Sequence, residues 1–148
     1  MNYFQLMSTE GAQISFDAGF DKNIQAILQR KYENITDLSM YHIKIPEFIC
    51  MADVLFQPAF MVSEIVYECI RLYEPYIKSK RIVLYNEQYC GIFYILILET
   101  RLLENKSSLF NKHIIIVRDQ SKDKVVVSLE LLESLLKRHI IGFQVKEL

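Results

Sequence analysis

The stretch MVSEIVYECIRLYEPYIKSKRIVL, residues 61–84, contains the pattern that decides the fold. An apolar run ends at Ser63, a helical pattern follows, Pro75 stops it, and a β-rich run begins at Arg81. Residues 125–145, VVVSLELLESLLKRHIIGFQV, repeat this order of strand, serine, helix and strand around Ser128, which is 65 positions after Ser63. Because a solenoid needs at least three repeats, we expect one domain with two similar strand-to-helix segments.

Each of the two expected helices is amphipathic. After Ser63, one side of the helix is predicted to be buried and carries Ile65, Val66, Cys69, Ile70 and Tyr73. The opposite, wet side carries Glu64, Tyr67, Glu68, Arg71 and Glu74. After Ser128, the expected buried stripe consists of Leu129, Leu132, Leu135 and Leu136. Glu133 and Lys137 have the i,i+4 spacing of an ion pair on the wet side of that helix.

The remaining elements follow from periodicity and turn residues. Asp21 precedes a helical stripe of Ile24, Ile27, Leu28 and Tyr32. Residues 41–45 alternate as a half-buried strand, residues 81–85 and 89–98 form a hairpin, and 113–117 give another strand. Residues 119–124 are a polar loop before the strand 125–127. We therefore predict an α+β fold, mainly an antiparallel or mixed sheet with about three helices.

The length, net charge and cysteine content of the chain favour one compact soluble domain over residues 1–148. A chain of 148 residues buries enough surface to fold without a metal or disulfide. Its formal net charge of −1 lacks the strong positive field of a nucleic-acid binder. The longest apolar run, residues 92–98, is too short to cross a membrane, and the N-terminus lacks the features of a secretory signal. With three cysteines and no CxxC pair, a cytoplasmic protein with free thiols is expected.

The serines raise the question of catalysis. A nucleophile elbow requires G-x-S-x-G, but Met61 and Ile65 stand where the glycines around Ser63 should be. Both Ser63 and Ser128 instead occupy the position of a helix N-cap, and Glu130 places a negative charge near the second helix N-terminus. Capping accounts for both serines, so we interpret them as structural.

No other residue pattern indicates chemistry. Cys69 falls on the expected core stripe, and neither Cys50 nor Cys90 has the local surroundings of a reactive thiol. His42, His113 and His139 lack the spacing of zinc ligands. We therefore predict no catalytic residue, no cofactor and no metal. A small enzyme whose residues converge only in three dimensions remains an alternative.

The tyrosines are the more suggestive feature. Tyr67 is predicted on the wet side of its helix between Glu64, Glu68 and Arg71, and exposed tyrosines often anchor protein interfaces. The alternative is a ring that simply lies over neighbouring side chains. The short basic cluster at residues 78–81 is expected to be a solvated connection, because so few charges neutralise few phosphates.

Residues 55–148, with their two strand–serine–helix–strand segments, resemble a family of small bacterial α+β proteins. That family, formerly a domain of unknown function, is now predicted to supply immunity proteins of polymorphic toxin systems. The resemblance implies stoichiometric binding of a cognate protein toxin, with no nucleic acid, no membrane and no catalytic residue.

The resemblance has limits along the chain. The second segment reads Ser128-Leu129-Glu130 where the family has Ser-Glu, and residues 1–50 match no part of the pattern. An interaction or assembly module unrelated to toxins is the other alternative. Neither the toxin nor the oligomeric state follows from the sequence.

Overall fold

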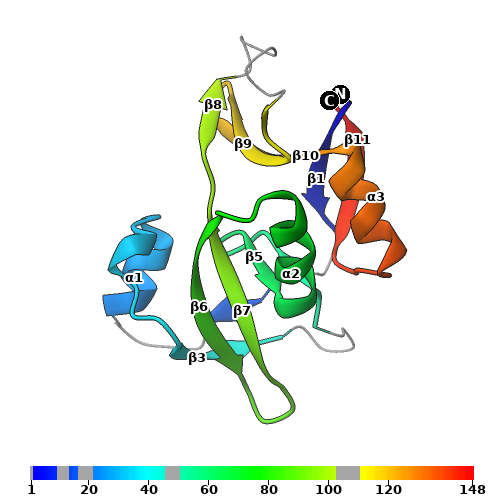
Figure 1. Ribbon diagram of the computed structural model, residues 1–148. Helices are drawn as coiled ribbons and strands as arrows, with labels where there is room; N and C mark the ends of the chain where they lie inside the picture. The colour runs from blue at the N-terminus through cyan, green and yellow to red at the C-terminus, as the bar shows by residue number, and fades with distance from the viewer. Residues whose placement is uncertain (1, 10–13, 17–21, 46–50, 103–110) are drawn as a thin grey trace.

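The computed structural model describes residues 2–9, 14–16, 22–45, 51–102 and 111–148 (Figure 1). Over these residues it contains three α-helices, one short 3-10 helix and eleven strands in two sheets. The α+β fold predicted from the sequence is therefore confirmed, and so is the expectation of about three helices in a structure made mainly of sheet.

The larger sheet has six strands and is built around one long hairpin. Its order is β2 (Ser15–Phe16), β3 (Ser39–Lys44), β6 (Lys78–Tyr85), β7 (Cys90–Ile97), β5 (Met61–Ser63) and β4 (Val54–Leu55). β6 and β7 pair over their full lengths as the predicted hairpin, while β3 runs parallel to β6. Because β6 begins at Lys78, the expectation that residues 78–81 form a solvated connection is wrong.

The smaller sheet has five strands and joins the two ends of the chain. Its order is β11 (Phe143–Glu147), β1 (Tyr3–Ser8), β10 (Lys122–Ser128), β9 (Ile114–Asp119) and β8 (Thr100–Leu102). β1 pairs antiparallel with both β10 and β11, and the N- and C-termini lie side by side (Figure 1). This pairing of distant segments has no local sequence signal.

A tight turn replaces the loop expected at residues 119–124. Gln120 and Ser121 both have positive φ, 47° and 67°, as the central residues of a type I′ hairpin do. Asp119 and Lys122 already pair with each other. The prediction of a longer loop was wrong because Gln-Ser lacks the Asn-Gly signature by which such turns are recognised.

The helices are α1 (Lys22–Leu28), the 3-10 helix η1 (Tyr32–Asn34), α2 (Glu64–Tyr73) and α3 (Leu129–Lys137). The first is shorter than its predicted stripe, since Arg30 has a φ of 60° that ends the helical backbone. Leu28, expected on the buried side, is exposed, and Ala26 is buried with Ile24 and Ile27.

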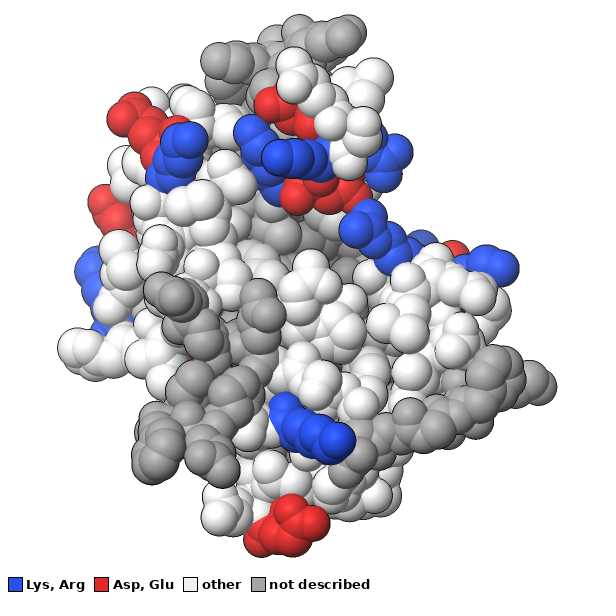
Figure 2. Space-filling model, turned by 180° about the vertical axis from the view of Figure 1, so that it is seen from behind, with Lys and Arg blue, Asp and Glu red and all other residues white. Residues whose placement is uncertain are grey.

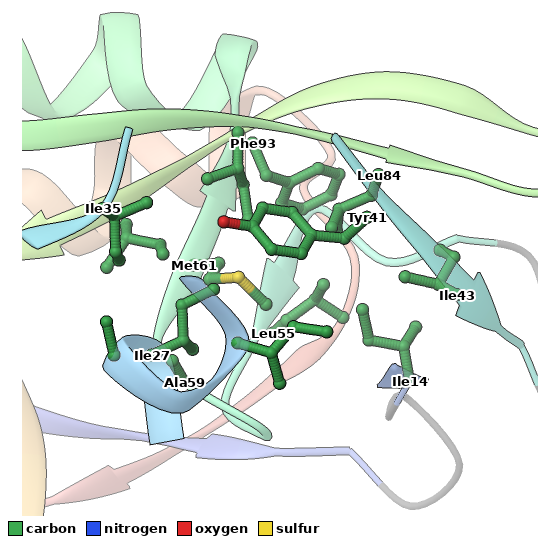
Figure 3. Close-up of a cluster of buried hydrophobic side chains, with 14 of the residues drawn as sticks. Ile14, Ile27, Ile35, Tyr41, Ile43, Leu55, Ala59, Met61, Leu84 and Phe93 are labelled. Carbon is green, nitrogen blue, oxygen red and sulfur yellow. The ribbon is translucent and has the colours of Figure 1, made fainter. Parts of the chain in front are cut away.

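Two main cores hold these elements together. The first lies between α1 and the larger sheet, where Ile27, Tyr41, Met61, Leu84 and Phe93 are all buried (Figure 3). The second combines α2 and α3 with side chains of both sheets. A small third cluster, which includes Ile115 and Val126, belongs to the five-stranded sheet alone.

The two serine-containing segments have the same topology. In the segment from β5 through α2 to β6, the strand β7 lies between β5 and β6 and is antiparallel to both. In the segment from β10 through α3 to β11, β1 takes this middle position. We call these units 1 and 2; each is a split β-α-β unit, so the repeat in the sequence corresponds to a repeat in the fold.

The helices of the two units pack against each other at equivalent positions. Cys69, six residues after Ser63, places its sulfur 3.4 Å from the hydroxyl of Ser134, six residues after Ser128. The buried residues of α2 are Val66, Cys69 and Ile70, and those of α3 are Leu131, Leu132 and Leu135. A contact between equivalent positions is what an approximate two-fold relation between the units produces.

This packing corrects the predicted stripes at their edges. Ile65 and Leu136, both expected inside, are 48% and 54% exposed. Leu129 is half-buried, and Leu131 occupies the core instead. The sequence pattern predicts an apolar stripe on each helix that is wider than the contact between the two helices. Each helix covers only part of the stripe on the other. Glu133 and Lys137 do not form the expected ion pair.

Candidate functional site

Ser63 begins α2 without capping it by its side chain. Its backbone has the extended conformation of an N-cap, but the side chain makes no capping hydrogen bond. The hydroxyl donates instead to Oδ1 of Asp53 at 3.0 Å, while the Ser63 N–H donates to the Asp53 carbonyl. The predicted side-chain cap was therefore wrong at Ser63, because a carboxylate ten residues earlier takes the hydroxyl.

Asp53 also connects unit 1 to the chain after α3. Its Oδ2 accepts from the N–H of Ile141 at 3.2 Å, and its own N–H donates to the Ile141 carbonyl at 3.0 Å. Beside this junction Gly142 has a φ of 109°, and a Cβ there would lie 2.6 Å from the Cβ of Ala52. The close approach of the two segments therefore requires glycine.

Ser128 behaves as predicted. Its hydroxyl accepts from the N–H of Leu131 at 3.3 Å, which caps α3, and the residue is fully buried. The same hydroxyl lies 2.7 Å from Nδ1 of His113. Glu74 accepts from the backbone N–H of His113, not from its ring. These contacts hold a helix start in place, with the serine hydroxyl inside the core.

The other residues considered for chemistry are separated. Cys69 is buried between the helices, Cys90 is exposed, and Cys50 lies outside the described residues. His42 lies 3.4 Å from the carboxylate of Glu87, and His139 follows the end of α3. Among the residues that the structure describes, no cluster of three or more His, Cys, Asp or Glu side chains could hold a metal ion. None of the helices described is long and apolar enough to span a membrane.

The predicted binding residues lie together on the outer side of α2. Glu64, Glu68 and Arg71 are exposed, as expected. Ile65 and Leu72 join them, with exposed fractions of 48% and 70%. Ile65, Glu68 and Leu72 follow one another at helical spacing, so two large apolar side chains flank a carboxylate on one line of the helix. We call the set of these five residues and Tyr67 the α2 face.

Tyr67 differs from its prediction because it is half-buried rather than fully exposed. Its ring stacks on that of Tyr94 from β7, with the ring centroids 3.9 Å apart and the planes 8° from parallel. The Ser79 hydroxyl donates to its phenolic oxygen at 3.3 Å. The guanidinium of Arg71 lies over the ring, 5.8 Å from its centroid. Tyr67 is thus held rigidly at the base of the helix surface.

A hollow of about 410 Å³ opens beside Tyr67, and we call it the basic hollow. Its lining consists of Asp37, Tyr67, Arg71, Ser79, Lys80, Arg81 and Tyr94. Three cations therefore face one carboxylate. Lys80 and Arg81 belong to the short basic cluster, and folding brings Arg71 to them from α2.

The single carboxylate of the basic hollow is already paired. Arg81 donates from Nη2 and Nε to the carboxylate of Asp37 at 2.6 and 3.2 Å, and its backbone N–H donates to the same group. The hydrogen bond from the Arg81 side chain holds the pKa of Asp37 below its usual value. Burial raises the pKa of Tyr94, so this phenol stays protonated at neutral pH.

A second hollow, of about 350 Å³, lies on the back of the molecule between the two sheets. Its walls are largely apolar and include Phe56, Phe60 and Leu98. Figure 2 shows basic and acidic side chains gathered above a hollowed and largely uncharged centre. At its edge Asp123 accepts from both Arg30 and Arg118, so these three charged side chains are paired with one another.

No protein-family model matches the chain, and no curated protein is similar enough to count as a relative. The site is therefore interpreted from its own geometry.

The sequence predicts Tyr67 and the charged residues of the α2 face, but it places Ile65 inside, gives no role to Leu72 and does not reveal the basic hollow. Helical periodicity is enough to bring Glu64, Glu68 and Arg71 together. Tyr94 was interpreted only as part of a buried strand, and Asp37 carried no signal at all. Recognising the hollow requires the pairing of β7 with β6, which puts Arg81 opposite Tyr94.

Proposed function

We propose that this protein acts by stoichiometric binding in the cytoplasm, as an immunity protein that occupies and blocks a cognate protein toxin. The α2 face carries the proposal. It combines two exposed apolar side chains, Ile65 and Leu72, with charges of both signs and a tyrosine held in place by its neighbours. Aromatic side chains and Arg are enriched in protein interfaces, and the α2 face offers both beside its exposed apolar groups.

Tyr67 is the proposed anchor. A side chain that is already ordered loses little conformational freedom on binding, and Tyr67 is fixed by Tyr94 and by Ser79 before any partner arrives. Glu68 and Arg71 would orient the partner, since charges at the rim of an interface govern orientation and association rate more than affinity.

Packing within the protein gives no other reason for this surface. Leu72 is not needed to hold α2, whose buried contacts are made by Val66, Cys69 and Ile70. A protein-interaction module unrelated to toxins would use the same face, and rescue from a toxin separates the two proposals. A small enzyme is the less favoured alternative, because Ser128 and Cys69 are buried and the Ser63 hydroxyl is bound to Asp53.

The test requires a toxin candidate, to be sought among the products of the genes that adjoin the gene of this protein. Growth of cells that express the toxin is compared with and without the protein, and the purified pair is titrated by calorimetry. We expect rescue and a one-to-one complex. Tyr67→Ala should weaken binding by at least about 1 kcal/mol, roughly five-fold, and Leu72→Ala by a similar amount.

Leu136→Ala is the matched control for Leu72→Ala, because Leu136 is also an exposed leucine, 54% against 70%, but lies on α3. Circular dichroism checks that every variant is folded. Absence of both rescue and binding would refute immunity for that pair. If the Tyr67→Ala and Leu72→Ala proteins still rescue growth but the Leu136→Ala protein does not, the interface lies on α3.

A further inference from the structure

We propose that the basic hollow binds a carboxylate side chain, Asp or Glu, presented by the protein partner. This inference rests on the proposed function and specifies the chemistry that the partner must bring. It is carried by the charges of the hollow, the orientation of its hydroxyls and a comparison of the two units.

The hollow has more positive than negative charge. Asp37 is hydrogen-bonded by Arg81, and the charge of Lys80 also helps to lower its pKa. Arg71 and Lys80 are the two remaining cations of the lining. Within the described part of the chain neither makes an ion pair, and the only recorded contact of Arg71 is with the ring of Tyr67. Two cations without carboxylate partners at one concave site are complementary to an anion.

The hydroxyls in the hollow can also act as donors. Because Ser79 donates its proton to the oxygen of Tyr67, the phenolic proton of Tyr67 is left for another acceptor. Tyr94 is protonated, as burial raises its pKa, and it lines the same hollow. A carboxylate has two oxygens and therefore suits a site with two cations and two phenolic donors.

The fold does not require tyrosines at positions 67 and 94, because unit 2 has other side chains at the equivalent positions. Tyr67 is the fourth residue after Ser63, and its equivalent in unit 2 is the buried Leu132. Tyr94 pairs with Val62, and the equivalent Val127 pairs with Phe4.

The next strand shows the same contrast. Tyr94 is paired on its other side with Arg81, whereas Phe4 is paired with Glu147. The same architecture thus tolerates two apolar side chains and a carboxylate where unit 1 has two phenols and the guanidinium of Arg81.

The surroundings favour a protein carboxylate over a nucleic acid. One face of Tyr67 is covered by Tyr94 at 3.9 Å, so a base cannot stack there. Besides burial, Glu64 and Glu68 raise the pKa of Tyr94, so their negative charge also acts near the hollow. Binding of a phosphate backbone depends on many cations, whereas the hollow offers only Arg71 and Lys80 beyond the pair of Arg81 and Asp37, which suits a single carboxylate.

The first experiment tests the isolated protein with three probes: a capped hexaglutamate peptide, a capped hexalysine peptide and a six-nucleotide oligo-dT. Binding is followed by NMR shifts of the tyrosine side chains at low salt. We expect hexaglutamate alone to shift Tyr67 and Tyr94. Arg71→Gln combined with Lys80→Gln should weaken this binding at least ten-fold, while Tyr67→Phe should weaken it a few-fold.

The matched control combines Lys122→Gln with Lys146→Gln, which removes two exposed charges from the other sheet. It should leave the hexaglutamate shifts unchanged. Equal loss in the control would mean non-specific attraction and would overturn the inference. So would tighter binding of oligo-dT than of hexaglutamate.

The second experiment separates this inference from the proposed function. If the Arg71→Gln, Lys80→Gln protein binds the cognate toxin with unchanged affinity, carboxylate recognition is wrong but immunity stands. If hexaglutamate binds in the hollow and no neighbouring toxin is bound or neutralised, immunity is wrong and the carboxylate site stands.

Discussion

Nδ1 of His113 and the hydroxyl oxygen of Ser128 lie 2.7 Å apart, with the serine fully buried at the first turn of α3. The distance would suit a catalytic pair. The hydroxyl, however, also accepts from the Leu131 N–H, and the backbone N–H of Ser128 donates to the His113 carbonyl. The pair therefore fixes the start of α3 against the residue that precedes β9.

Ser128→Ala should destabilise the protein by about 1–3 kcal/mol, because it removes a cap and leaves buried polar groups unsatisfied. Ser63→Ala is the comparison and should cost about 1 kcal/mol, since it removes only the bond to Asp53. Urea unfolding of both variants measures these changes. A Ser128→Ala protein as stable as the parent would contradict this assignment.

Phe93→Ala should destabilise the protein by about 3–5 kcal/mol, because Phe93 is buried in the centre of the first core (Figure 3). Ile92 precedes it on β7 with its side chain on the opposite face, where it is 36% exposed. Ile92→Ala should therefore cost much less. Equal losses of unfolding free energy would show that the two faces of β7 are not as different as described.

Thiol labelling should distinguish the two described cysteines. Cys90 is exposed and should react rapidly in the native protein, whereas Cys69 is buried against Ser134 and should react only as the protein opens. Mass spectrometry of labelled peptides, without reductant, measures both rates. Faster labelling at Cys69 than at Cys90 would contradict the packing of α2 on α3.

Asp123 should make stability depend on acid pH. Its pKa is lowered, first by the hydrogen bond from Arg118 and further by that from Arg30. A carboxyl with a lowered folded-state pKa stabilises the protein above its ordinary pKa, near about 4, and this contribution is lost as pH falls through the lowered value.

Asp123→Asn should therefore destabilise the protein at pH 7 and flatten the loss of stability between about pH 5 and pH 2. Asp37→Asn is the control with the same type of partner. Asp37 is more exposed, 46% against 17%, so its effect should be smaller. Urea unfolding across this pH range measures both, and a larger effect at Asp37 would reverse our ranking of the two ion pairs.

The order of elements could be predicted from the sequence wherever the signal is local. Ser63 and Pro75 bracket α2, and the run from Cys90 to Ile97 has the apolar character of a buried strand. The hairpin of β6 and β7 needs only a short turn and two β-rich runs. These features depend on residues within a few positions of one another.

What could not be predicted depends on distant partners. The Ser63 hydroxyl donates to Asp53 instead of capping α2. The ring of Tyr67 is partly covered by Tyr94, 27 positions later. Periodicity states which side of a helix is apolar, but only the neighbouring helix decides that Ile65 and Leu136 stay outside. The candidate site lies where the locally predicted helix α2 meets Asp37, β6 and β7.

The position of β1 has a consequence for how the protein is made. Tyr3 pairs with Ser128, and its carbonyl accepts from the N–H of Leu148, so β1 lies between β10 and β11, which are synthesised long after it. The strands of the six-stranded sheet are all synthesised before β10 and β11, and until these two appear β1 has neither of its partners. Contacts between such distant residues form slowly. Completion of the five-stranded sheet should therefore follow that of the six-stranded sheet.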